Sequence, residues 1–280
     1  MISSLKNKNF IVHIPIILGA IVMLYPLIWL LSGSFKLPQE IFANSSLWPK
    51  TFTLENYTIG WKGVSGLSFG TFFKNSFVIS GLSIIGNIIS CSMAAYAFAR
   101  LQFKFKNIFF ALMLVSIMIP YHVIIIPQYI FFNKLDWINT FLPLVVPKFL
   151  ATDGFFIFLL VQFIRGLPRE LDEAATMDGC GPIRIYWKII LPLLLPAIAT
   201  TAIFTFIWTW NDFFSQLIYL TDPKNFTVSL GLRLFLDSMG QSQWGPMFSM
   251  SILSLVPVFV MFLVFQRYII EGITSGGIKG

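Results

Sequence analysis

The chain has 280 residues, of which 56% are hydrophobic and only 11% are charged, and its formal net charge is +7. An ordinary soluble domain carries about 25% charged residues, so this chain cannot cover the surface of a water-soluble globule. The composition therefore excludes soluble and disordered proteins and predicts an integral membrane protein. The positive charge is too dispersed for a nucleic-acid surface, and the sequence predicts no nucleic-acid partner.

Long uncharged segments predict the membrane spans, because a helix needs about 20 apolar residues to cross the hydrocarbon core. Five segments lack charged residues altogether, whereas the fourth span contains Lys148 and Asp153. These two residues lie i and i+5, which is poor spacing for a helical pair, and they predict a break. The apolar runs are continuous, which excludes a β-barrel. The sequence thus predicts an all-α fold with six transmembrane helices, at about 10–31, 73–99, 108–130, 141–164, 191–216 and 246–268.

The distribution of basic residues predicts the orientation of these spans. Six spans place both termini on one side, together with the connections 100–107 and 165–190. This set of segments holds eleven of the 19 Lys and Arg residues, and the longer connections on the other side hold eight. Because cytoplasmic loops carry an excess of Lys and Arg, both termini are predicted to be cytoplasmic.

The cytoplasmic loop 165–190 contains the signals of a short helix. Pro168 suits the first turn, where a missing N–H costs nothing, and Gly179 suits the end. Between them lie three acidic residues that favour the positive end of the helix dipole, namely Glu170, Asp172 and Glu173. The sequence therefore predicts a capped helix of about ten residues at the membrane surface.

One side of this helix is shallow, because Leu171, Ala174 and Ala175 follow at i, i+3 and i+4. A shallow face can press closely into a groove on another protein. A plain cytoplasmic connector is the alternative that these residues leave open.

Three motifs resemble a known family. Glu173-Ala174-Ala175, Gly179 and Leu191-Pro192 have the spacing of the EAA signature of ABC importer permeases. Residues 208–213, 220–223 and 227–232 resemble the carbohydrate branch of these permeases, of the MalG type, and so does the C-terminal sequence 272–280. The resemblance covers essentially the whole chain.

The resemblance implies a single type I ABC importer permease domain over residues 1–280, in the bacterial plasma (inner) membrane. It implies the transmembrane subunit of an ATP-driven, binding-protein-dependent importer for a sugar or oligosaccharide. The implied partners are a homologous second permease in a heterodimer, two ATPase subunits, an extracytoplasmic sugar-binding protein and the lipid bilayer. The chain lacks a G-x-x-x-x-G-K-[ST] motif, so it is predicted not to be an enzyme, and ATP and Mg are expected on the partner ATPase.

The resemblance also assigns roles to residues. The loop helix would dock in the ATPase cleft through Glu170, Glu173, Ala174, Ala175 and Gly179, with Glu173 opposite a basic residue. The tail would reach the ATPase through Gly276, Gly277 and Lys279, unless it is simply a frayed end. The last outer loop would contact the binding protein through Asp237, Ser238, Gln241, Ser242, Gln243 and Trp244.

Aromatic rings and hydrogen-bonding side chains, which together recognise sugars, gather near the outer part of the fifth span. A candidate substrate path is formed by Trp208, Trp210, Asn211, Asp212 and Gln216. An aspartate near a span is costly unless it is paired or wet, so Asp212 indicates a water-filled path. A position in the interfacial belt is the open alternative, since residue 212 lies about 30 Å along a helix that starts at Leu191.

Two other classes of membrane protein are less compatible with the sequence. A membrane-embedded sugar transferase would need clustered Asp, Arg or His, whereas Asp212, Lys148, Asp153 and His122 are scattered. A secondary transporter would need ion-coupling carboxylates within its spans. His13 and His122 lack metal-ligand spacing, so no metal site is predicted.

Overall fold

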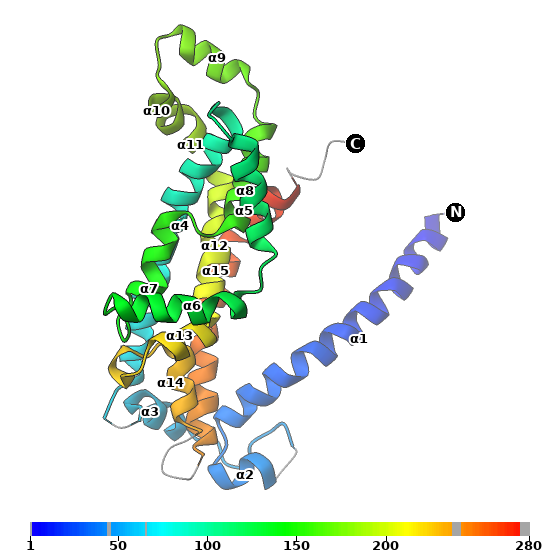
Figure 1. Cartoon of the computed structure of the whole chain (residues 1–280). Coiled ribbons are helices and arrows are strands. Elements are labelled where there is room, and N and C mark those ends of the chain that lie inside the picture. The colour runs from blue at the N-terminus through cyan, green and yellow to red at the C-terminus, as the bar shows by residue number, and fades with distance from the viewer. Residues whose placement is uncertain (1, 44–45, 65, 237–241, 275–280) are drawn as a thin grey trace. The chain divides into compact units, whose positions relative to one another are not determined.

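The computed structural model describes residues 2–43, 46–64, 66–236 and 242–274. In these residues the regular structure is helical, apart from an isolated bridge between Val64 and Leu67 (Figure 1). They form two compact units: unit 1 comprises Met1–Gly70 and Leu232–Val256, and unit 2 comprises Thr71–Gly231 and Pro257–Gly280. The all-α fold is confirmed, whereas the single domain over 1–280 stays a prediction.

Helices long and apolar enough to cross a membrane account for the predicted spans. Four segments are candidates on their own: His13–Ser34, Phe69–Arg100, Leu142–Gly166 and Trp244–Arg267. Two more arise if each of two bent helix pairs counts as one span, namely Lys106–Ile117 with Tyr121–Lys134 and Pro182–Leu193 with Leu195–Asn211. The described residues thus contain four to six spans, and six only if both bent pairs cross the membrane.

Unit 1 is organised around Asn56. It contains α1 (Ile2–Ser34), α2 (Pro38–Ala43), α3 (Glu55–Lys62) and the first part of α15 (Trp244–Thr274). The buried Asn56 amide donates to the carbonyl oxygens of Ser34 and Lys36, at 2.9 and 2.8 Å. The Asn56 carbonyl accepts the hydroxyl of Ser249 at 2.9 Å. One residue of α3 therefore joins the end of α1 to α15.

Unit 2 contains the segments that position the candidate functional residues. Its longest helix is α4 (Phe69–Arg100), which belongs to unit 2 from Thr71 onward. The elements that follow α4 are α5 (Lys106–Ile117), α6 (Tyr121–Lys134), α7 (Leu142–Val145), η1 (Val146–Leu150), α8 (Gly154–Gly166), α9 (Glu170–Met177), α10 (Pro182–Ile185), η2 (Tyr186–Ile190), α11 (Leu191–Leu193), α12 (Leu195–Asn211), α13 (Phe214–Tyr219), η3 (Pro223–Asn225) and α14 (Val228–Leu234).

The region expected as one span over 108–130 is two helices in the structure. Helix α5 ends at Ile117 and α6 begins at Tyr121, with a bend of 102° between them (Figure 1). The cause is Pro120, which has no N–H to donate and disfavours helical geometry in the residue before it. Uncharged sequence alone did not reveal this break, because Pro120 is itself apolar.

The fourth span contains the break predicted from Lys148 and Asp153. After η1 the chain turns through Ala151, whose φ is +55°, and α8 starts at Gly154. Because the helix is interrupted here, Lys148 Nζ reaches Asp153 Oδ2 at 2.8 Å although the two residues are i and i+5. The irregular spacing is therefore resolved by a turn that brings the two charges together.

The fifth span is bent by 75° between the segments Pro182–Leu193 and Leu195–Asn211. It includes η2, which has π-helical geometry, and two prolines, Pro192 and Pro196, that flank the bend. The regular helix also stops at Asn211, because Asp212 takes an extended conformation with ψ 119°. The predicted continuous span 191–216 is therefore α11, α12 and the first half of α13, with a break at Asp212 between α12 and α13.

Close backbone approach at Gly86 gives a first prediction. A Cβ at Gly86 would lie 2.8 Å from the Phe149 ring and 3.0 Å from the Lys148 carbonyl carbon, whereas a Cβ at Gly81 would meet nothing within 4 Å. Since a backbone atom cannot yield cheaply, we expect Gly86→Ala to lower stability by about 1–3 kcal/mol. The measurement is the thermal unfolding midpoint in detergent. Gly81→Ala on the same helix is the control, and an equal midpoint for the two variants would contradict the prediction.

Candidate functional site

The short helix predicted in the loop 165–190 is confirmed as α9. Its first turn carries Glu170, Asp172 and Glu173, whose negative charges are stabilised by the positive end of the helix dipole. The helix ends at Met177, and two residues later Gly179 has φ +76° and so takes the left-handed conformation that a glycine adopts without strain. The Cys180 N–H closes the turn by donating to the Ala175 carbonyl at 2.9 Å.

Arg100, the last residue of α4, fastens this loop to the membrane helices. Its Nε lies 2.9 Å from Asp172 Oδ2, and its terminal nitrogen donates to the Leu167 carbonyl at 2.8 Å. The side chains are only 7% and 21% exposed, so the pair is partly shielded from water. Leaving one member of such a pair alone is costly.

The far edge of the loop is also attached to α4. The Tyr96 hydroxyl donates to the Pro182 carbonyl at 3.1 Å, and the Tyr96 ring lies against the Tyr186 ring with centroids 5.4 Å apart. The hydroxyl of Tyr186 lies 2.7 Å from that of Ser92. Helix α4 therefore holds the loop 165–190 both near its start, through Leu167 and Asp172, and near its end, through Pro182 and Tyr186.

The predicted coupling residues do not all face the same way. Ala175 is buried in the apolar cluster that α9 shares with α4 and α8, whereas Glu170, Glu173 and Ala174 are exposed. In Figure 1, α9 and α10 lie beyond the ends of α5 and α8. The exposed surface also includes Met177, which is 88% exposed. Helix α9 thus exposes an acidic and partly apolar surface, while its contacts with α4 fix its position.

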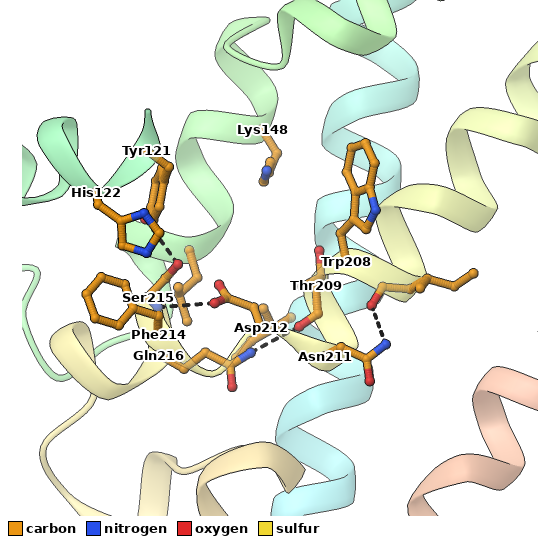
Figure 2. Close-up of a pocket in the computed structure, with 13 residues that line it drawn as sticks. Tyr121, His122, Lys148, Trp208, Thr209, Asn211, Asp212, Phe214, Ser215 and Gln216 are labelled. Carbon is orange, nitrogen blue, oxygen red and sulfur yellow. Dashed lines mark hydrogen bonds between the residues drawn. The ribbon is translucent and has the colours of Figure 1, made fainter. Parts of the chain in front are cut away.

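Residues at the break after α12 form one wall of a cavity of about 460 Å³ within unit 2. The opposite wall comes from the start of α6, and Lys148 of η1 lies over the space between them (Figure 2). The lining residues include Tyr121, His122, Lys148, Trp208, Thr209, Asn211, Asp212, Phe214, Ser215 and Gln216.

The structure brings together four of the five residues predicted for the substrate path. Trp208, Asn211, Asp212 and Gln216 line the cavity. Trp210 does not, because its ring is 2% exposed and stacks on Phe206 with centroids 5.2 Å apart. Trp208 and Trp210 therefore lie on different sides of α12. Trp208 faces the cavity, and Trp210 is buried in the protein interior.

Hydrogen bonds shape the cavity wall around Asp212. The Asp212 carboxylate accepts the Ser215 N–H at 3.1 Å, and the Ser215 hydroxyl accepts that of Tyr121 at 3.0 Å. Gln216 donates to the Thr209 carbonyl at 3.0 Å and accepts from the hydroxyl of Thr227 (Figure 2). These contacts fix the turn between α12 and α13 against the start of α6.

A second cavity of about 290 Å³ shares Tyr121, Lys148, Asp212 and Ser215 with the first. It is also lined by Tyr219, whose hydroxyl donates to Gln128 at 3.3 Å. Burial raises the pKa of Tyr219, so its phenol remains a hydrogen-bond donor at neutral pH. Lys148 and Asp212 thus belong to the walls of both cavities.

The polar residues of α4 that hold the segments around these cavities were not among the residues predicted from the sequence. Asn87 donates to Asp153 Oδ2 at 2.6 Å and to the Thr205 hydroxyl at 3.1 Å. Ser90 donates to the Lys148 carbonyl at 2.6 Å, and Ser76 accepts the Val228 N–H at 2.9 Å. The signal was present, because Ser76, Ser80, Ser83, Asn87 and Ser90 recur at helical spacing within an apolar run.

The remaining predicted residues lie in other surroundings. Gln243 and Trp244 belong to unit 1, where the Gln243 N–H donates to the Phe235 carbonyl at 2.8 Å and the Trp244 ring packs edge-on against Phe42. The predicted contact residues Asp237, Ser238 and Gln241 and the predicted tail residues Gly276, Gly277 and Lys279 lie outside the described residues. In the described part of the chain no group of three or more His, Cys, Asp and Glu residues could hold a metal ion.

The described residues combine several helices of membrane-spanning length, two cavities with aromatic and polar lining, and a short helix attached at one end, which is consistent with a membrane transport component. The chain matches the family described as "Binding-protein-dependent transport system inner membrane component" over residues 86–274. This match covers more than half of the chain, and the chain belongs to that family.

Relatives match over nearly their whole length. The chain is 35% identical to the trehalose/maltose transport system permease protein MalG of Thermococcus litoralis, covering 98% of each chain. It is 35% identical to the arabinooligosaccharides transport system permease protein AraQ of Halalkalibacterium halodurans, covering 93% of each. A chain of a bacterial ABC transporter involved in the import of the acidic polysaccharide alginate has the same fold, with a TM-score of 0.82 at 20% identity over 94% of this chain and 97% of that one.

The attachment of the loop to Arg100 gives a second prediction. In Arg100→Gln the bonds to Asp172 and Leu167 are lost, and the Asp172 carboxylate is left unpaired. We expect hydrogen–deuterium exchange of backbone amides in residues 167–180 to become about tenfold faster, since such a loss costs roughly 1–3 kcal/mol locally. The control is Arg169→Gln, which removes an exposed charge next to the same helix. Unchanged exchange in Arg100→Gln would show that the loop is held by other contacts.

Proposed function

We propose that the chain is the transmembrane permease subunit of an ATP-driven, binding-protein-dependent importer for a sugar or oligosaccharide. The observation that carries this proposal is α9, an acidic surface helix tied to α4 by Arg100, in a loop whose far edge is held by Tyr96. A movement of another protein bound to such a helix can be transmitted to the membrane spans. The two relatives whose printed names specify trehalose/maltose and arabinooligosaccharides support the substrate class.

The proposed complex has four kinds of contact for this chain. A homologous second permease completes the translocation path as a heterodimer, two ATPase subunits hold ATP and Mg, and an extracytoplasmic protein delivers the sugar. The fourth is the lipid bilayer of the bacterial plasma membrane, in which both termini would face the cytoplasm. A solved transporter with a related fold is described as a complex with a periplasmic protein carrying an alginate pentasaccharide, which supports a delivery partner of this kind.

The proposed coupling follows the attachments of the loop. When the ATPase subunits close on ATP, they would move Glu170, Glu173 and Ala174 of α9. The ion pair between Arg100 and Asp172 would carry this motion to α4, and α10 with η2 would carry it to α12. Because α12 ends at the cavity that contains Trp208 and Asp212, movement of the loop would change the cavity.

The outer contacts of the subunit are proposals as well. The binding protein would meet the segment that contains Asp237, Ser238, Gln241, Gln243 and Trp244. The C-terminal residues Gly276, Gly277 and Lys279 would reach the ATPase interface.

Co-purification tests the assembly. The tagged chain, extracted from its native membrane, should bring down a second multi-span permease and a P-loop ATPase, and vesicles containing the complex should take up sugar only with ATP and the binding protein. Recovery of the chain alone in a stable form would overturn the proposal and favour a membrane-embedded enzyme.

Reversal of one charge on α9 gives a third prediction. Glu173 is exposed and makes no ion pair within the described residues. We expect Glu173→Lys to reduce ATP-driven uptake at least about tenfold, because a lysine would face the basic residue proposed on the ATPase. The amount of subunit in the membrane should not change, and Glu55→Lys on α3 serves as the matched exposed control. Reversing the ATPase residue as well should restore uptake, and failure of that rescue would refute the pairing.

A further inference from the structure

The charges around the two cavities of unit 2 do not balance. Lys148 is neutralised by Asp153, whose two carboxylate oxygens lie 2.8 and 3.2 Å from its Nζ. Asp212 lies on the walls of both cavities and accepts a hydrogen bond from the Ser215 N–H. Asp212 takes part in neither the Arg100–Asp172 nor the Lys148–Asp153 ion pair.

Counted together, the charged groups of the two cavities carry one more negative than positive charge. Lys148, Asp153 and Asp212 line the second cavity, and Lys148, Asp212 and the His122 imidazole line the first. The Asn87 amide, which bonds Asp153, is neutral and leaves this count unchanged. Because Lys148 is already paired with Asp153, a ligand that enters meets in Asp212 a carboxylate that belongs to neither ion pair.

The uncharged groups of the first cavity suit a ring with hydroxyl groups. Trp208 is 49% exposed, and its other neighbours are the aromatic rings of Phe155, Phe156 and Phe204. Phe214 faces it across the cavity beside His122 (Figure 2). Aromatic surfaces therefore flank a space whose polar groups are hydroxyls, amides, the His122 imidazole, the Lys148 ammonium and the Asp212 carboxylate.

An anionic ligand would enter this space at a double cost. It would lose hydration in a region of reduced dielectric, and it would stand close to the carboxylate of Asp212. A neutral glycoside would instead donate its hydroxyl groups to that carboxylate and place an apolar ring face on Trp208. A carboxylate accepts hydrogen bonds but cannot donate one, so it favours hydroxyl ligands over carboxylate ligands.

We propose that this cavity admits uncharged, hydroxyl-rich glycosides and discriminates against acidic ones, and that Asp212 sets the discrimination. The proposal rests on the proposed function, because it concerns the substrate class of the same path. It differs from the sugar class alone, since the solved transporter of related fold serves an acidic polysaccharide.

The test compares neutral and acidic probes on the intact membrane complex without its binding protein. Binding of labelled maltotriose, arabinotriose and trigalacturonate is measured by equilibrium dialysis at equal concentrations. We expect the wild-type complex to prefer at least one neutral trisaccharide by about tenfold or more. Asp212→Asn should reduce this preference by about tenfold, because asparagine still accepts the Ser215 N–H but carries no negative charge to disfavour the acidic probe.

Two additional measurements make the outcome unambiguous. Asp222→Asn is the matched control, since the Asp222 carboxylate also accepts a backbone N–H, that of Lys224 at 2.9 Å, but lies outside both cavities. In an Asn211→Cys background, a cationic thiol reagent should react faster than an anionic one of equal size, and Asp212→Asn should reduce that ratio. This second readout probes the charge of the cavity without any sugar.

The outcomes separate this inference from the proposed function. Equal binding of neutral and acidic probes, absence of binding by all three, or a preference that Asp212→Asn does not change would each overturn the inference. The proposed function is judged independently by co-purification of a P-loop ATPase. If the ATPase co-purifies and the preference is absent, only the inference fails; if no ATPase co-purifies, the proposed function fails.

Discussion

The carboxylate of Asp153, at the point where η1 gives way to α8, is the group on which unit 2 depends. Lipid offers no hydrogen-bond partners, so an interrupted helix and a charge can persist at such a position only if protein groups satisfy them. Lys148 supplies the opposite charge, and the Asn87 amide donates a further hydrogen bond to Asp153. The Ser90 hydroxyl donates to the Lys148 carbonyl. The broken segment is thereby locked onto α4, and Gly86 leaves the space that the approach requires.

Helix α4 consequently serves two parts of unit 2 at once. Asn87 and Ser90 of α4 hold Asp153 and Lys148, and Lys148 lines both cavities. At the end of α4, Tyr96 and Arg100 hold the loop 165–190. Because an α-helix is stiff over this length, the two sets of contacts cannot shift independently. A rigid helix of this kind could transmit a displacement of the loop 165–190 to the cavities. No series of side-chain rearrangements between the two places would be needed.

The sequence predicted those features that follow from local rules. Length and apolarity located the candidate spans, and Pro168, the acidic first turn and Gly179 located α9, because capping and dipole effects act within a few residues. The bends were less accessible. Pro120 lies inside an uncharged run, so a search for charged interruptions passed over it, and its effect on backbone geometry is a bend of 102°. The extended conformation of Asp212 likewise shortened a helix that hydropathy alone continued to residue 216.

Side-chain roles were predictable only where one helix face decides them. Trp208 and Trp210 are two residues apart and point to different sides of α12, and no property of the isolated sequence says which side meets a cavity. Arg100 was used as a topology signal, yet its guanidinium contacts Asp172 across 72 positions of sequence. The pairing of Asn87 with Asp153 is equally non-local, although serines and asparagine at helical spacing indicate a polar interface between spans.

The path from the loop 165–190 to the cavity passes through the least regular helix of unit 2. Pro192 cannot donate to the Lys188 carbonyl, and Pro196 cannot donate to that of Pro192, so two successive helical turns lack a hydrogen bond. The π-helical geometry of η2 and the 75° bend accompany these losses. Ser92 and Tyr96 fix the start of this segment to α4, whereas Thr200 and Thr201 bond back to their own helix beyond the bend. The bend therefore has fewer backbone hydrogen bonds than a regular helix, and beyond it Asn87 donates to the Thr205 hydroxyl at 3.1 Å, so α4 holds this segment on both sides of the bend.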